Sequence, residues 1–154
     1  MKKYLILLAL MLSVGLVYPH CQVPCGIYDD AVRIITFKED FATISKAMGE
    51  INTLSAKKDP QSINQLNRWI TTKEKHANNI QKVVSDYFLT QRVKSKNKNY
   101  DKHLRFLHEI LVSAMKCKQT VDSQNVDNAL KSLDRFVNVY FDDHGLEHLQ
   151  KMSD

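Results

Sequence analysis

Residues 34–51, IITFKEDFATISKAMGEI, establish the fold class of this chain. Large apolar residues recur in this stretch at intervals of three and four positions, which places their side chains on one face of an α-helix. The residues of this apolar face are Ile34, Phe37, Phe41, Ile44, Met48 and Ile51. The stretch is therefore predicted to be an amphipathic helix that belongs to a larger helical body.

Three later stretches repeat the helical spacing. Their apolar positions are Ile63, Leu66, Ile70, Ala77, Ile80, Val84 and Tyr87, then Tyr100, Leu104, Leu107, Leu111 and Ala114, and finally Val126, Leu130, Leu133, Val137 and Tyr140. Short links near residues 57–61, 90–99 and 122–125 force consecutive helices to lie antiparallel. The sequence therefore predicts an all-α fold: an up-down antiparallel four-helix bundle at residues 29–142, followed by a polar C-terminal tail at residues 143–154.

The first nineteen residues differ in character from the rest. Lys2 and Lys3 form a basic start, and residues 4–17 form an apolar run without charge. This is the pattern of a secretory leader, and the run is short for a membrane span, although an uncleaved membrane anchor is the alternative. We expect residues 1–19 to be removed and the mature chain to be exported, periplasmic or extracellular, without stable membrane association. A cytoplasmic location after removal of a propeptide is the alternative.

The expected cleavage point lacks the usual small residues. His20 follows Val17, Tyr18 and Pro19, whereas an ordinary signal peptidase would more naturally cut near residues 13–15. A mature chain that begins at His20 is therefore expected to need a dedicated maturation peptidase.

The charge of the mature chain argues against one class of function. Removing the leader, with its two lysines, leaves 20 basic residues against 17 acidic residues and a net charge of +3. Charges of both signs are mixed along the chain, so no nucleic-acid surface is expected. The densest basic run, residues 92–103, is interpreted as a solvated loop. Three cysteines leave one thiol unpaired in an exported protein.

HCQVPCGIY at residues 20–28 gathers a histidine and two of the three cysteines. If the chain is cut before His20, the α-amine and imidazole of this residue become available as metal ligands. The amide nitrogen of Cys21 and the thiolates of Cys21 and Cys25 join them. The amine and the amide nitrogen close one five-membered chelate ring, and the amide nitrogen and the Cys21 sulfur close a second. The Cys25 sulfur completes a plane of two nitrogens and two sulfurs.

This donor set favours nickel or copper. A backbone amide deprotonates readily only for metals that prefer square-planar nitrogen ligation, whereas structural zinc sites are tetrahedral and use Cys and His side chains. Two thiolates and an anionic amide also make a Ni(II)/Ni(III) couple accessible. The spacing alone leaves two alternatives open. One is a Cys21–Cys25 disulfide, which export would favour, and the other is a zinc or copper site without a catalytic role.

The motif H-C-x-x-P-C-G-x-Y at residues 20–28 resembles the nickel-binding hook of nickel-dependent superoxide dismutases, which is the N-terminus of the mature enzymes. SDYF at residues 85–88 resembles the segment of the second helix that brings a tyrosine to the active site in this family. The resemblance implies a four-helix bundle assembled as a homohexamer, with one nickel ion per chain. It also implies conversion of superoxide to dioxygen and hydrogen peroxide by Ni(II)/Ni(III) cycling.

The same resemblance implies roles for five residues. His20 would supply its amine and an axial imidazole, Cys21 its amide nitrogen and thiolate, and Cys25 the second thiolate. Tyr28 and Tyr87 would line the small pocket in front of the metal. A non-catalytic nickel or copper carrier with the same chelate is the alternative function, although a carrier needs neither a tyrosine pocket nor an oligomer. An exported helical interaction protein with a Cys21–Cys25 disulfide is a third interpretation.

Four further residues are weaker candidates. Lys118 resembles, loosely, a family lysine that attracts the anion. The Glu-Arg pair that holds the axial imidazole in the family has no secure counterpart in this sequence. Cys117 is interpreted as a half-buried thiol of the core. His144 and His148 lie four positions apart and could share a metal, but Gly145 weakens a helix there.

Overall fold

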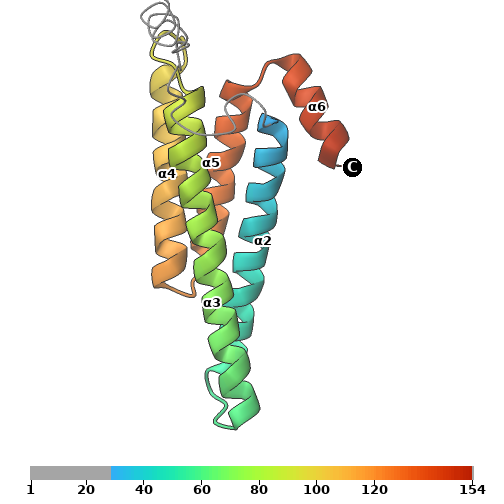
Figure 1. Ribbon diagram of the computed structural model, residues 1–154, viewed down its shortest axis with the longest axis vertical. Helices are drawn as coiled ribbons and strands as arrows, with labels where there is room; N and C mark the ends of the chain where they lie inside the picture. Colours follow the sequence, from blue (N-terminus) through green and yellow to red (C-terminus); the bar gives the residue numbers. More distant parts are fainter. Residues whose placement is uncertain (1–28, 154) are drawn as a thin grey trace, which may run out of the picture.

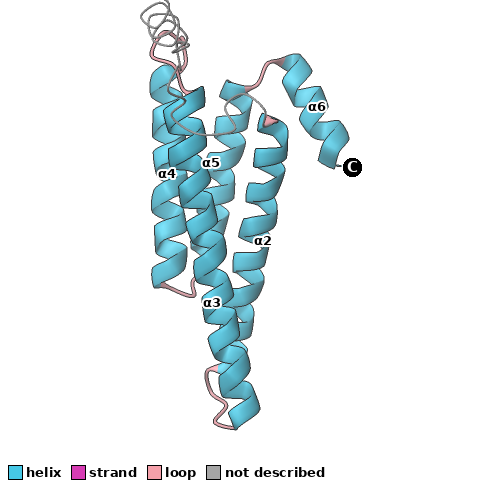
Figure 2. Cartoon of the chain, viewed as in Figure 1, coloured by secondary structure: helices cyan, strands magenta, loops and turns pink. Residues whose placement is uncertain are grey.

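The computed structural model describes residues 29–153, within which all regular structure is helical (Figure 2). The helices are α2 (Asp30–Leu54), α3 (Pro60–Val83), its π-helical continuation η1 (Val84–Arg92), α4 (Tyr100–Gln119), α5 (Gln124–Tyr140) and α6 (Asp143–Ser153). Helices α2 to α5 run alternately down and up beside one another (Figure 1), which confirms the predicted all-α bundle. No helix in this part of the chain combines the length and hydropathy of a membrane span. The predicted hook, residues 20–28, lies outside the described residues.

Aspartate side chains begin two of the helices. Asp29 Oδ1 accepts a hydrogen bond from the Ala31 amide at 2.8 Å, and Asp59 Oδ1 accepts one from the Ser62 amide at 2.9 Å. Such caps satisfy backbone donors that have no partner inside the helix. Pro60 occupies the first position of α3, where its missing N–H is not needed. The cap of α2 therefore lies immediately after the predicted metal-binding motif.

The predicted apolar stripes meet in one core between the four helices. Side chains with no exposed surface include Ile34, Phe37, Phe41, Ile44, Ala77, Ile80, Phe88, Leu107, Ile110, Leu133 and Phe136. The beginning of the second stripe differs, because Ile63 and Ile70 are 47% and 39% exposed. The first half of α3 extends with α2 past the ends of α4 and α5 (Figure 1), so those two helices do not cover it.

Two buried polar side chains tie α3 to its neighbours. Asp40 Oδ2 accepts a hydrogen bond from Asn79 Nδ2 at 2.6 Å, which joins α2 to α3. Lys73 Nζ donates to the carbonyl oxygens of Cys117 and Lys118, both at 2.6 Å, and so caps the end of α4. A cation at a helix C-terminus is favourable because unpaired carbonyl groups point toward it.

The α-helical hydrogen bonding of α3 changes to π-helical hydrogen bonding where η1 begins, and the helix continues. The Val93 amide donates to the Phe88 carbonyl oxygen at 2.9 Å, five residues back, as π-helical geometry requires. Two side chains add bonds of the same span, from Thr90 to the Ser85 carbonyl oxygen and from Gln91 to that of Asp86. η1 carries Tyr87 and Phe88 into the core. Short π-helical segments of this kind often occur at functional sites.

The C-terminal segment is helical, where the sequence analysis expected a polar tail at residues 143–154. Asp142 Oδ1 accepts a hydrogen bond from the Gly145 amide at 2.8 Å, which starts α6. Leu149 is only 6% exposed, and α6 packs against α2. A local cap, the buried Leu149 and the partly buried Leu146 fix this helix against the bundle. The periodicity of apolar residues is a weak predictor of a helix when so few of its residues contact the core.

Candidate metal centre

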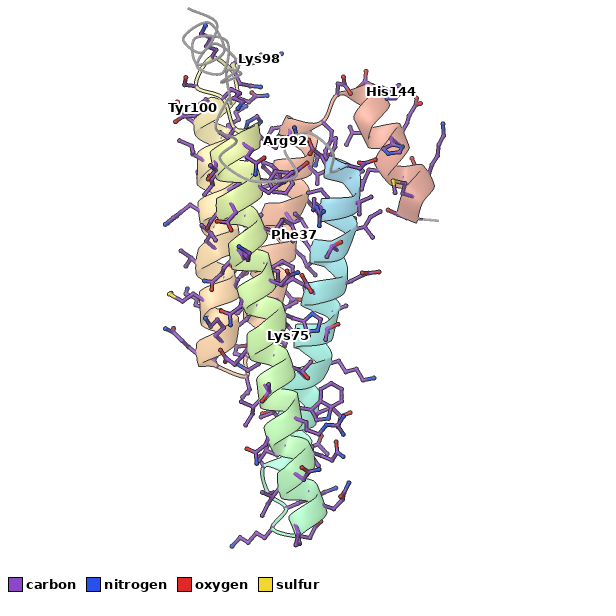
Figure 3. The ribbon with its side chains drawn as sticks, in the orientation of Figure 1. Phe37, Lys75, Arg92, Lys98, Tyr100 and His144 are labelled. Atoms are coloured by element: carbon purple, nitrogen blue, oxygen red, sulfur yellow. The ribbon has the colours of Figure 1, made fainter. Side chains whose placement is uncertain are left out.

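Of the five predicted site residues, only Tyr87 lies in the described part of the chain. His20, Cys21, Cys25 and Tyr28 lie outside it, and residue 29, the first described residue, directly follows Tyr28. The end of the bundle at which α2 begins is therefore the part of the structure that adjoins the predicted hook. Arg92 lies in the upper part of the bundle, toward that end (Figure 3).

Tyr87 belongs to a polar cluster, which we call the Asp30 cluster, made of Asp30, Tyr87, Arg92 and Tyr140. Asp30 Oδ1 accepts hydrogen bonds from the Tyr87 hydroxyl and from Arg92 Nε, the latter at 3.0 Å. Asp30 Oδ2 accepts one from the Tyr140 hydroxyl at 2.7 Å. Arg92 Nη2 donates to Tyr87 Oη at 2.6 Å. One carboxylate thus joins the first turn of α2, η1 and the end of α5.

Aromatic packing holds the Tyr87 ring in place. Tyr87 is 4% exposed, and its ring meets the buried ring of Phe88 edge to face, with 5.2 Å between centroids. The guanidinium carbons of Arg92 and Arg33 lie 4.8 Å and 5.9 Å from the Tyr87 ring centroid, within the range of cation–π attraction. The hydroxyl end of the side chain is polar and bonded, while the ring belongs to the core.

Burial raises the pKa of both tyrosines of the cluster. Desolvation and then the hydrogen bond to Asp30 raise the pKa of Tyr87, the hydrogen bond from Arg92 lowers it, and the net result is a pKa of about 12. Desolvation, followed by the hydrogen bond to Asp30, also raises the pKa of Tyr140 above its ordinary value. A low-dielectric environment disfavours the charged form of a phenol, so both hydroxyl groups retain their protons at neutral pH.

A second contact lies beside the Asp30 cluster. His148 Nε2 of α6 is 2.7 Å from Asp29 Oδ2. This hydrogen bond is the main reason that the pKa of Asp29 lies below its ordinary value. His148 therefore contacts a carboxylate of α2, while His144 is exposed on α6 (Figure 3). Within residues 29–153, no group of three or more His, Cys, Asp or Glu side chains could hold a metal ion.

Two other candidates from the sequence, Lys118 and Cys117, lie in the last turn of α4, at the end of that helix away from the Asp30 cluster. Lys118 Nζ donates to Asn78 Oδ1 at 2.7 Å, in the last turn of a helix whose first turn is near η1. The structure therefore does not bring Lys118 to the Asp30 cluster. Cys117 is fully buried, and desolvation raises its pKa to about 11. The prediction of a core thiol is confirmed, with deeper burial than expected.

Sequence reasoning missed three members of the Asp30 cluster. Asp30 has the ordinary appearance of an acidic residue in the first turn of a helix. Arg92 belongs to the basic run that the sequence predicts to be a solvated loop, but the structure places it in the last turn of η1. Tyr140 was recognised only as the last position of an apolar stripe. The hydrogen bonds of Asp30 to Tyr87 and Tyr140 span 57 and 110 positions, so no local spacing could reveal them.

An all-α bundle joined to an N-terminal Cys/His motif defines a class of helical metalloproteins, and comparison with protein families narrows that class. The family model of nickel-containing superoxide dismutase matches residues 16–144. The match includes the whole of the motif at residues 20–28 and helices α2 to α5, while nearly all of α6 lies beyond it. No curated protein and no solved structure matched the chain.

The chain belongs to the nickel-containing superoxide dismutase family. It is accordingly an oxidoreductase, its substrate is superoxide and its cofactor is nickel. Family membership favours an enzyme over the alternative of a metal carrier, and it extends over both the helical bundle and the motif from which the nickel ligands were predicted.

Proposed function

We propose that this chain converts superoxide to dioxygen and hydrogen peroxide at one nickel ion held by His20, Cys21 and Cys25. The observation that carries the proposal is the position of the motif, which the family match includes and which directly precedes the helix turn that binds Tyr87. The donor set suits nickel, because thiolates and nitrogen donors are the ligands of choice for a soft, square-planar site. When bound, nickel would supply the one-electron Ni(II)/Ni(III) couple.

The protein's own residues have separable tasks in this proposal. The two thiolates, the Cys21 amide nitrogen, and the amine and imidazole of His20 would be the groups that hold the metal. Tyr28 and Tyr87 line the pocket in front of it and exclude larger ligands. The rigid packing of Tyr87 supports this task, because a wall that excludes ligands must not move aside.

The charge distribution supports capture of an anion. The mature chain carries a net charge of +3, and Arg33 lies over the Tyr87 ring beside Arg92, whose own charge is paired with Asp30. Positive potential near a site raises the rate at which a small anion encounters it. The reaction also consumes two protons for each peroxide that leaves, so pocket water or Tyr28 must pass protons from solvent.

Maturation and assembly complete the proposal. Residues 1–19 would be a leader removed by a dedicated peptidase, and residues 20–28 the hook. The mature chain would assemble as a homohexamer in the periplasm or outside the cell, or in the cytoplasm if the removed segment is a propeptide. The α-amine of His20 can bind nickel only after the bond from Pro19 is cut, so processing would switch the enzyme on.

Three forms of the chain test this proposal: the full-length chain, the chain that begins at His20, and a chain with one extra residue before His20. Each is supplied with nickel, and both bound nickel and the rate of superoxide loss are measured. Only the form that begins at His20 should disproportionate superoxide. Comparable activity in the form with one extra residue would show that the free amine is not a ligand, and the proposed hook would have to be abandoned.

A further inference from the structure

The directions of the hydrogen bonds at Tyr87 define what its hydroxyl group can do. The hydroxyl donates to Asp30 Oδ1 and accepts from Arg92 Nη2 at 2.6 Å. A phenol has one hydrogen to donate, and an arginine side chain has no acceptor. A Tyr87 hydroxyl that donates to Asp30 therefore has no hydrogen left to donate toward a reacting molecule.

Asp30 is itself held from three directions. Its Oδ1 also accepts from Arg92 Nε at 3.0 Å, and its Oδ2 accepts from the Tyr140 hydroxyl at 2.7 Å. Tyr140 stacks on the buried ring of Phe136, with 4.8 Å between centroids, so this anchor belongs to the core. Both carboxylate oxygens thus have fixed partners, and the carboxylate cannot rotate to release Tyr87 without breaking several bonds.

We infer that Asp30 is a positioning residue for superoxide dismutation: it turns the hydroxyl hydrogen of Tyr87 into the bundle, so that Tyr87 serves the pocket as a neutral hydrogen-bond acceptor and is not the proton donor to peroxide. The inference rests on the proposed function for the place of Tyr87 in front of the nickel. The hydrogen-bond directions on which it depends belong to the described structure.

The electrostatics of the site agree with this geometry. Among residues 29–153, charged and titratable groups that face Tyr87 include Asp30 and Arg33 from α2, Arg92 from η1 and, through Asp30, Tyr140 from α5. Burial raises the pKa of Tyr87 to about 12. A proton donor works best with a pKa near the working pH, and the surroundings of Tyr87 move its pKa in the opposite direction.

Asp30→Asn, Tyr87→Phe and the double variant test the inference in the nickel-loaded chain that begins at His20. Asp101→Asn is the matched control, because it removes one negative charge from the first turn of α4, where Asp101 is exposed. Asp30→Asn should lower turnover on the order of tenfold, as small misplacements of active-site groups do. The double variant should be no slower than Tyr87→Phe, because both changes remove one function. The control should match the unchanged chain.

A spectroscopic measurement separates positioning from a general loss of structure. The ring-carbon resonance of Tyr87 in labelled protein, assigned by its loss in Tyr87→Phe, reports ionisation of this side chain. In Asp30→Asn it should begin to shift at a lower pH than in the unchanged chain, because a negative neighbour is gone while Arg92 remains. The same onset in both proteins, or a turnover in Asp30→Asn equal to or above that of the control, would overturn the inference.

One further comparison keeps the test decisive if Asp30→Asn does not fold. The pH dependence of turnover in Tyr87→Phe should run parallel to that of the unchanged chain, at a lower level, because no proton donor is lost. A change in its shape would identify Tyr87 as a donor and overturn the inference. An unchanged chain with no nickel-dependent activity would instead refute the proposed function, while the ionisation of Tyr87 would remain measurable.

Discussion

Cys21 and Cys25 precede the helical bundle in the chain, and the described core is complete without them. We predict that Cys21→Ser and Cys25→Ser each abolish nickel binding and activity while helical content stays nearly the same. Elemental analysis of the purified variants and far-ultraviolet circular dichroism measure the two effects. Full activity in Cys25→Ser would contradict the ligand assignment, and a large loss of helix would show that the motif also supports the fold.

His20 allows a finer prediction, because the proposed hook uses its imidazole and its amine as two separate ligands. His20→Ala retains the amine and removes only the imidazole from the groups that would hold nickel. The variant should therefore keep part of its nickel and lose most of its turnover. Tyr28→Phe and Tyr87→Phe should keep the metal and lose less activity than His20→Ala. Nickel content and rate measured on the same samples would show whether binding and turnover separate in this order.

At the residue scale, the sequence predicts what is local and misses what is distant. The Cys/His motif was recognisable because its donors lie within six positions of one another, and chelate chemistry depends on such short spacing. Tyr87 could be named only through the family resemblance. Asp30 and Tyr140 meet across 110 positions, and their contact depends on how α2 and α5 pack. No rule of residue spacing contains that information.

The pKa values of the cluster also predict how stability depends on pH. The folded-state pKa of Tyr87, about 12, lies above the ordinary value for tyrosine of about 10. Its contribution to stability is therefore complete below about pH 10 and is lost as the pH rises through about 12. Tyr87→Phe cannot ionise, so its free energy of unfolding should fall less over this interval than that of the unchanged chain. Denaturant titrations at matched pH would show parallel curves if the prediction is wrong.

Among the elements, α6 was the least predictable and offers a direct comparison of two contacts. The His148–Asp29 pair is 46% and 43% exposed at its side chains, and exposed ion pairs contribute less than about 1 kcal/mol. Burial of Leu149 is the stronger contact, since truncation of a buried leucine costs about 2 kcal/mol or more. We therefore predict that Leu149→Ala destabilises the protein more than His148→Gln does. Denaturant unfolding measures both, and the reverse order would show that the His148–Asp29 contact holds α6 in place.

The elements that sequence periodicity predicted well are those covered on a wide face. Helix α2 has its apolar positions buried from Ile34 to Ile51, and the helices around it continue the same core. The first half of α3 has equally regular spacing, yet Ile63 and Ile70 are exposed there. Periodicity indicates which face of a helix is apolar, but the lengths of neighbouring helices decide how much of that face is covered.

For the molecule as a whole, the bundle is built on one hydrophobic core, and the segment for which we propose nickel binding precedes it in the chain. Its core extends from the turn that carries Asp30 to the buried end of α4, where Lys73 bonds the last carbonyl groups. The family match runs through this body and the motif before it, but stops at the start of α6. Beyond the matched region, α6 packs against α2, and His148 of α6 contacts Asp29 at the start of that helix.

The π-helical turn of η1 has a consequence for comparing this chain with its relatives. A wide turn accommodates one residue more than an α-helical turn of the same length, so it acts as a single-residue insertion. Each residue of an α-helix rotates the following side chains by about 100°. A relative with a plain α-helix here would need a one-residue gap in the alignment between residues 84 and 92. Without that gap, the alignment would pair Arg92 with a position on a different face of the helix. The hydrogen bond from Arg92 to Tyr87 would then be overlooked.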